Sequence, residues 1–262
     1  MFQVYSISFK LFYIQYIVLT TSNMCRYMGG KGKIGKEISN HIHSICEDAG
    51  LIDPTYFEPF VGMCGVMRHV NYSTRIACDK NEDIIMMWNS IQEGWLPPRY
   101  LDADQVNTLK NQDHPSDLRG FAAFGCSFGG VYFGSYLGRY KNGREEIDRS
   151  SRSIERVSKL VKDVNFIDAR SYLDHSPHGM VIYCDPPYLK ACKGVRGMRN
   201  FSGFDHDVFW ETMRKWHNDG NVVIVSEFDA PDDFRCVWEK NTIKNVSHSN
   251  YVIEKLFMYE PN

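Results

Sequence analysis

Short strand-like segments alternate with helical segments along most of this 262-residue chain. The strand-like segments are Tyr56–Phe60, Arg75–Cys78, Val164–Asp168, Met180–Cys184, Asn221–Ser226 and Tyr251–Tyr259. Helical stripes lie between them, such as Phe209, Met213 and Trp216, which Asp205 is placed to cap. The alternation predicts an α/β fold with a mostly parallel, doubly wound sheet and helices on both faces. Ligands bind beyond the carboxyl ends of such strands, so polar residues directly after each strand are the first candidates for a site.

The composition is that of a globular chain with reduced thiols. Apolar residues make up 43% of it, which suits one domain with an insertion or two small domains. The eight cysteines form no C-x-x-C pair, and no histidine pair has zinc-ligand spacing. We therefore expect no metal site, buried free thiols and a reducing, cytoplasmic setting. The net charge of −2 means that any contact with nucleic acid must come from local basic patches.

Two regions depart from the alternation. Within residues 1–25, the apolar run Leu11–Leu19 is too short to span a bilayer comfortably, and it lacks the flanks of a signal peptide. We expect an N-terminal appendage without a catalytic part, a membrane-associated segment being the minority alternative. Residues 95–144 contain a Pro-Pro break and a stretch rich in glycine and aromatic residues. They are interpreted as an insert between two parts of one catalytic domain, 26–94 and 145–262.

The strongest chemical motif is Asp185-Pro186-Pro187-Tyr188, directly after an apolar strand. The exocyclic amine of adenine is a poor nucleophile, because its lone pair is delocalised into the ring. The Asp185 carboxylate and the Pro186 carbonyl could each accept a hydrogen bond from that amine and so favour the charge that develops as it attacks a methyl group. Tyr188 offers a flat face for an extruded base. The plainer alternative is a Pro-Pro turn with a surface acid.

Three weaker signals surround this motif. A glycine-bearing turn, which includes Phe60 and Gly62, follows the first strand and would let the backbone approach a small ligand. Asp79 ends the next strand, where an acid can bind both ribose hydroxyls or simply cap a helix. The segment Arg26–Lys33 has the pair Gly29-Gly30 followed by Lys31 before the first helix, which suits a carboxylate or phosphate but also an ordinary solvated loop.

Taken together and in this order, the four pieces resemble the Dam-like (alpha) group of N6-adenine-specific DNA methyltransferases, including phage and prophage members. The shared pattern is aromatic-x-Gly-Gly-Lys, Glu-Pro-Phe-x-Gly-x-Gly, an acid ending the second strand, an insert and Asp-Pro-Pro-Tyr, and it covers about residues 26 to 240. The resemblance implies a Rossmann-like methyltransferase fold with a target-recognition insert. It also implies S-adenosylmethionine as cofactor, double-stranded DNA as partner and a flipped-out adenine as substrate.

The resemblance also implies roles for individual residues. The cofactor contacts would be Tyr27, Lys31, Phe60, Gly62, Asp79, Asp168 and Asp185. The catalytic residues would be Asp185, Pro186 and Tyr188, with no metal, no covalent intermediate and no obligate protein partner.

Two positions depart from the group's pattern. Tyr27 replaces the usual tryptophan but still offers a ring, and Cys64 replaces the second glycine of the turn. A cofactor that passes close to Cys64 would bind less tightly, so a catalytically weakened DNA-binding relative is one alternative. An N4-cytosine methyltransferase is the other, because it attacks a similar amine with a similar tetrapeptide. Methylation of a protein or RNA amine, or a chance collection of motifs in a generic α/β domain, is less favoured.

Positive charge for DNA is expected in two places. Lys190, Lys193, Arg196 and Arg199 follow the Asp-Pro-Pro-Tyr motif with no acid among them. Arg139 lies beside the aromatic part of the insert, and base edges are often read by arginine. For a single lysine the plain alternative is a solvated surface charge.

Overall fold

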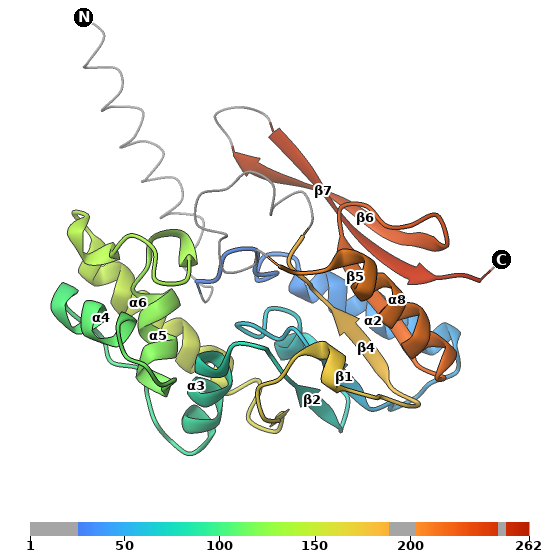
Figure 1. Ribbon diagram of the computed structural model, residues 1–262, viewed down its shortest axis with the longest axis horizontal. Coiled ribbons are helices and arrows are strands. Elements are labelled where there is room, and N and C mark those ends of the chain that lie inside the picture. Colours follow the sequence, from blue (N-terminus) through green and yellow to red (C-terminus); the bar gives the residue numbers. More distant parts are fainter. Residues whose placement is uncertain (1–25, 189–202, 246–249, 262) are drawn as a thin grey trace, which may run out of the picture.

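The computed structural model describes residues 26–188, 203–245 and 250–261, so the N-terminal appendage and the four basic residues from 190 to 199 lie outside the described residues. In the described part, seven strands form one sheet in the order β3-β2-β1-β4-β5-β7-β6 (Figure 1). The strands are β1 (Tyr56–Glu58), β2 (Arg75–Ala77), β3 (Asn165–Phe166), β4 (Val181–Cys184), β5 (Val222–Glu227), β6 (Phe234–Asn245) and β7 (Asn250–Tyr259).

The first five strands run parallel, and the last two form an antiparallel hairpin at one edge. The chain begins in the middle of the sheet with β1, moves outward through β2 and β3, and returns to the other side of β1 with β4. The strand order therefore reverses between β1 and β4. In doubly wound sheets this switch point opens a crevice beyond the carboxyl ends of the strands. The predicted mostly parallel, doubly wound α/β sheet is confirmed.

Helices connect the strands. They are α2 (Gly35–Asp48), α3 (Glu82–Gln92), α4 (Ala103–Lys110), α5 (Asp117–Gly125), α6 (Gly143–Ser158) and α8 (His206–Asn218), with short 3-10 turns η1 (Met67–His69), η2 (Phe128–Gly130), η3 (Leu137–Arg139) and η4 (Tyr172–Asp174). The predicted cap of α8 is confirmed, because the Asp205 carboxylate accepts hydrogen bonds at 3.0 Å from the backbone N–H groups of Asp207 and Val208.

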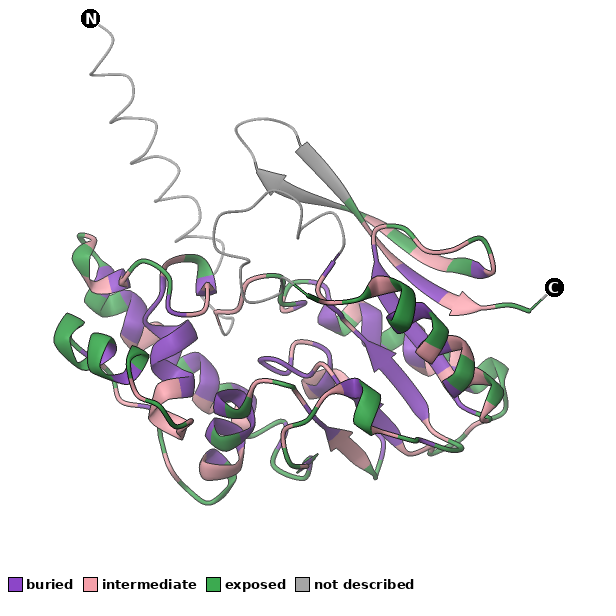
Figure 2. Ribbon diagram, in the orientation of Figure 1, coloured by how far each residue is buried: buried purple, intermediate pink, exposed green. Residues whose placement is uncertain are grey.

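Side chains of the central strands point alternately into two cores, one on each face of the sheet. In β4, Val181 and Tyr183 join the core formed with α2, α3, α5 and α6. Ile182 and Cys184 join the opposite core, which α8 covers with its buried stripe of Phe209, Met213 and Trp216. Figure 2 shows β4 buried along its length between these layers. Burial of each large α8 side chain contributes about 1.5–3 kcal/mol, and together they fix the sheet whose ends carry the motifs.

The region interpreted as an insert, residues 95–144, contains α4, α5, η2 and η3, and Figure 1 shows it beside α3 and α6. Helix α5 lies close to α3: a Cβ added at Gly120 would come within 2.4 Å of the Asp83 carbonyl oxygen. The buried Asp83 carboxylate pairs with Arg119 of α5 and accepts a hydrogen bond at 2.8 Å from the Tyr132 hydroxyl. The insert is thus tied to the rest of the chain by a buried ion pair and by packing.

Cysteine burial agrees with the sequence analysis. The described cysteines form no disulfide: five of them are buried thiols (Cys46, Cys64, Cys78, Cys126 and Cys184), and Cys236 is exposed. None of the helices in the described ranges is long and apolar enough to cross a membrane. Over the same ranges, no cluster of three or more His, Cys, Asp or Glu side chains could hold a metal ion.

Candidate active site

A cavity of about 1210 Å³ opens at the switch point of the sheet. Its lining includes the segment 27–32, the turn after β1, Asp79 after β2 and residues 185–188 after β4. The wall also includes Phe124, Gly130 and Tyr132 of the insert, residues 171–173, residues 203–205 and residues 253–255 of β7. Ligand pockets usually have volumes of 300–1000 Å³, so this cavity has room for more than one small molecule.

The glycine turn and Asp79 are joined by backbone hydrogen bonds. The Asp79 Oδ2 atom accepts from the Gly62 N–H at 2.9 Å, and Oδ1 accepts from the Asn81 N–H at 2.9 Å. Asn81, and not Asp79, caps α3. Burial raises the pKa of Asp79 to about 6, although the two N–H donors favour its charged form. The carboxylate is therefore held at the cavity wall by the backbone.

Position 62 requires glycine for two reasons, its left-handed backbone conformation and the close approach of the Tyr27 ring. It has a φ of +47°, and a Cβ there would lie 3.0 Å from Cε1 of the Tyr27 ring. The Gly62 carbonyl accepts a buried hydrogen bond at 3.0 Å from the Trp88 indole N–H. Phe60, the other predicted residue of the turn, lines the cavity and packs against Tyr172 with ring centroids 5.3 Å apart.

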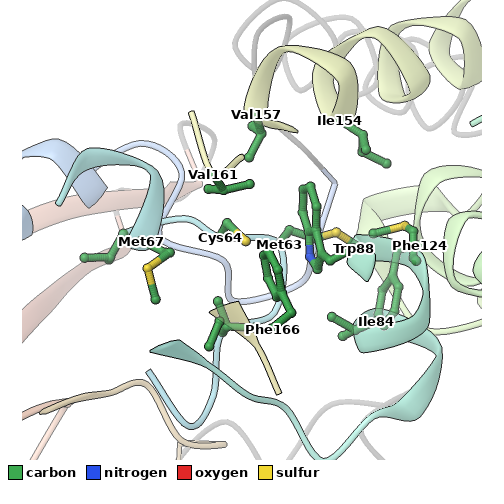
Figure 3. Close-up of a cluster of buried hydrophobic side chains, with 14 of the residues drawn as sticks. Met63, Cys64, Met67, Ile84, Trp88, Phe124, Ile154, Val157, Val161 and Phe166 are labelled. Atoms are coloured by element: carbon green, nitrogen blue, oxygen red, sulfur yellow. The ribbon is translucent and has the colours of Figure 1, made fainter. Parts of the chain in front are cut away.

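Cys64, the departure from the glycine pattern, lies on the other side of this turn. Its φ is +55°, a left-handed conformation that costs a non-glycine residue roughly 1–2 kcal/mol. The residue is fully buried, absent from the cavity wall, and belongs to the core cluster that also contains Met67 and Val161 (Figure 3). The cysteine side chain thus leaves the cavity lining unchanged.

The N-terminal segment is clamped between the turn and the insert. The Tyr27 ring packs against Phe124 at a centroid distance of 4.9 Å, and the Met28 N–H donates to the Gly130 carbonyl at 3.0 Å. Arg26 forms an ion pair with Glu146 of α6. These contacts bring the aromatic-x-Gly-Gly-Lys motif to the cavity, although the whole of helix α2 separates the motif from β1 in the sequence.

A compact charged group surrounds the start of the Asp-Pro-Pro-Tyr motif. The Lys31 Nζ atom donates to Asp185 Oδ1 at 2.7 Å and to the Gly29 carbonyl at 3.2 Å. The same ammonium lies 4.6 Å from the centroid of the Tyr188 ring. Burial raises the pKa of Asp185, and the Lys31 ammonium counteracts that rise. Lys31 therefore favours a charged carboxylate inside a largely buried site.

The rest of the tetrapeptide is fixed by neighbouring elements. Pro186 is buried and lines the cavity, and the Pro187 carbonyl lies 2.9 Å from Nε2 of His206. The Tyr188 ring meets Phe228 edge-on at 4.6 Å. Prolines restrict the backbone between these anchors, so the direction of the Pro186 carbonyl is set by the fold.

Asp168 is not brought to the cavity. Its side chain is 94% exposed, and its ion-pair partner is the nearby Arg170 at 3.9 Å. Phe166, the last residue of β3, stacks on Trp88 in the core with ring centroids 5.8 Å apart. The chain turns away after β3, and residues 171–173 line this side of the cavity instead.

The one predicted DNA contact within the described residues, Arg139, is exposed at the end of η3. Arg144 lies nearby in sequence and stacks over the Tyr100 ring at 4.6 Å. The other four predicted contacts, Lys190, Lys193, Arg196 and Arg199, fall outside the described residues.

Three further cavity residues were given no role by the sequence analysis. Glu254 of β7 accepts a hydrogen bond at 3.2 Å from the Tyr188 hydroxyl and lies 3.9 Å from Lys31 Nζ. Glu58 ends β1 and is buried, and burial raises its pKa to about 8. Tyr132 of the insert lines the cavity and is held by Asp83. A single acid within the apolar run 251–259 was the only signal for Glu254.

Comparisons with known proteins agree with the motifs. Residues 27–118, which contain Lys31, the glycine turn and Asp79, match the family model described as D12 class N6 adenine-specific DNA methyltransferase. The Retron Ec67 DNA adenine methylase of Escherichia coli is 25% identical over 246 residues, covering 80% of this chain and 78% of that protein.

A comparison with solved structures also gave matches. A putative methyltransferase from Escherichia coli, yhhF, superposes with a TM-score of 0.38 at 9% identity, covering 86% of this chain and 88% of that chain. A putative RNA methyltransferase from Pyrococcus horikoshii gives a TM-score of 0.35 at 9% identity, covering 86% of this chain and 84% of that chain.

Proposed function

We propose that the chain is a Dam-like, D12 class N6-adenine-specific DNA methyltransferase, whose cavity holds S-adenosylmethionine beside one adenine extruded from double-stranded DNA. One observation carries the proposal. Asp185 after β4 lines the same cavity as Asp79 and the glycine turn after β1. The residue expected to bind the reacting amine, Asp185, and the residues expected to bind the nucleoside of the cofactor, Asp79 and the glycine turn, thus share one cavity.

The residues of the cavity suit the cofactor. The turn at Gly62 has no room for a Cβ beside Tyr27, which leaves backbone against the cavity. The Asp79 carboxylate is set to accept hydrogen bonds from ribose hydroxyls, and Tyr27, Lys31 and Phe60 would line the remainder. When bound, the cofactor supplies a methyl group on a sulfonium centre.

The target amine would be activated by Asp185 and Pro186. Asp185 accepts one N–H of the amine and the Pro186 carbonyl accepts the other, which stabilises the positive charge that develops on nitrogen as the nitrogen–carbon bond forms and the carbon–sulfur bond breaks. Asp185 is also placed to take the proton that the nitrogen then loses. Tyr188 stacks on the base once the Lys31 ammonium, now 4.6 Å from the ring centroid, has moved aside.

DNA would be held from two sides of the cavity. Gly130, Phe124 and Tyr132 bring the insert, residues 95–144, to the cavity wall, and Arg139 is exposed on the same region. This placement supports a target-recognition role for the insert. The basic residues Lys190, Lys193, Arg196 and Arg199 follow the catalytic motif in sequence and would contact phosphates.

Long-read sequencing of host DNA tests the proposal. The protein is expressed in a host without adenine methylation, beside an Asp185→Ala variant and a control, Asp163→Ala, at a 70%-exposed aspartate. We expect N6-methyladenine at a defined sequence with the parent and the control, and none with Asp185→Ala. A mark on cytosine N4, or a mark that persists without the carboxylate, would overturn the assignment.

A further inference from the structure

The corner of the cavity around Lys31 contains a second carboxylate that the motifs do not include. Glu254 projects from β7, the antiparallel strand beside β5, and its side chain is only 16% exposed. Its Oε2 atom accepts the Tyr188 hydroxyl at 3.2 Å and lies 3.9 Å from Lys31 Nζ. One residue therefore contacts both the aromatic and the cationic member of the site.

The Lys31 ammonium has one N–H donor that is not directed at Asp185 or Gly29, and the Glu254 carboxylate lies near it. Lysine has three N–H donors. Two are directed at Asp185 (2.7 Å) and Gly29 (3.2 Å), and the Glu254 oxygen is too distant for a full hydrogen bond but near enough for a strong electrostatic attraction. The Lys31 side chain is 6% exposed, so solvent screens these charges weakly.

The charges of this corner do not cancel. Asp185 and Glu254 are two acids, Lys31 is the single base among the three, and the sum is one negative charge. Glu58, the neighbouring buried acid, is uncharged at neutral pH because its pKa is raised to about 8. A largely buried site with an excess negative charge attracts a ligand with positive charge.

We propose that Glu254 is a positioning residue of the active site, which anchors the Tyr188 ring by its hydroxyl and supplies the excess negative charge that favours a sulfonium ligand over its neutral thioether. The proposal rests on the proposed function, because it presumes that the cavity binds S-adenosylmethionine. It adds a residue from the C-terminal hairpin that lies outside the Asp-Pro-Pro-Tyr motif.

Two ligands that differ in one charge test this proposal. S-adenosylmethionine carries the sulfonium and S-adenosylhomocysteine does not, while the remainder of the two molecules is the same apart from the methyl group. Dissociation constants for both are measured by calorimetry with the parent and with Glu254→Gln, which keeps an acceptor for Tyr188 but removes the charge. We expect the preference for the sulfonium ligand to fall about three- to tenfold, since one negative charge is removed from the wall of a largely buried cavity.

Two further variants separate charge from structure. Glu254→Asp keeps the charge but shortens the reach to Tyr188, so it should retain most of the sulfonium preference. Glu239→Gln, at an exposed position of β6 in the same hairpin, should leave both dissociation constants unchanged. Equal weakening of both ligands in Glu254→Gln would overturn the proposal and leave the proposed function intact. Failure of the parent to bind either ligand would instead overturn the proposed function.

Discussion

Two acids line the cavity, and they are held in different ways. Asp79 accepts hydrogen bonds from two backbone N–H groups, Gly62 and Asn81, at 2.9 Å each. Asp185 is held by a side-chain ammonium, that of Lys31. Backbone donors are fixed by the fold, whereas a lysine side chain can rotate away. The comparison assigns Asp79 to a rigid binding wall and Asp185 to a site where partners exchange during the reaction.

Removal of the rigid acid should have the largest effect on binding. In Asp79→Ala the ribose would lose two charge-assisted hydrogen bonds, each worth about 1.5–3 kcal/mol, so the dissociation constant of S-adenosylhomocysteine should rise roughly 100-fold or more. The transfer rate at saturating cofactor should change far less. Titration calorimetry measures the dissociation constant, and single-turnover assays measure the transfer rate. A variant that binds normally but transfers slowly would reverse the roles of the two acids.

Removal of the exchangeable partner should shift a pH profile. Lys31 counteracts the rise that burial causes in the pKa of Asp185, so in Lys31→Gln that pKa should rise further. The reaction needs the charged carboxylate, and the acid limb of the transfer rate should therefore move to higher pH, by about one unit. Measuring the methyl-transfer rates of the parent and of Lys31→Gln between pH 5 and about 9 locates the acid limb of each profile. An unchanged limb would mean that Lys31 does not act on Asp185.

The raised pKa of Asp79 makes cofactor binding sensitive to pH in its own right. Ribose hydroxyls donate to the charged carboxylate, whose pKa in the free protein is about 6. Affinity should thus be full above that value and fall several-fold as the pH drops from about 6 to 5. Binding by Asp79→Asn, measured over the same range, should be flat. A parent protein with equally flat binding would show that Asp79 does not contact the ligand.

The smallest effect is expected at Cys64. Cys64→Gly relieves a left-handed conformation, which stabilises by roughly 1 kcal/mol, but it also removes a buried side chain and adds backbone entropy. The net change in unfolding free energy should stay within about 1 kcal/mol, and cofactor affinity should not change because the side chain faces the core. Thermal unfolding and calorimetry test both statements. A large gain in affinity would place this cysteine against the ligand.

The sequence predicted those parts of the site that short segments determine. The apolar runs predicted the five parallel strands and β7, and the stripe of Phe209, Met213 and Trp216 predicted α8 with its Asp205 cap. A strand buried on both faces reads as a continuous apolar run, and a helix buried on one face repeats its apolar residues every three to four positions. Residues placed directly after β1, β2 and β4 met in one cavity, as the topology of parallel strands requires.

Other parts depended on contacts between distant segments. Strand β6 was missed because its edge position tolerates charged residues such as Arg235, Glu239 and Lys240. Helix α5 was missed because its glycine, alanine and aromatic residues show no clear helical repeat of apolar side chains. Its position depends instead on close packing of Gly120 against the backbone of Asp83 in α3. Asp168 was assigned to the cofactor by the family resemblance, but β3 is a two-residue edge strand and the Asp168 side chain is 94% exposed.

The central claim is that Asp185 acts on the target amine and not on the architecture of the cavity. Purified Asp185→Asn keeps the size of the side chain and loses the charged acceptor. We expect it to bind S-adenosylhomocysteine within a few-fold of the parent, with a single-turnover rate of methyl transfer to adenine N6 at least roughly 1000-fold lower. A rate within tenfold of the parent, or a loss of binding as large as the loss of rate, would contradict the account.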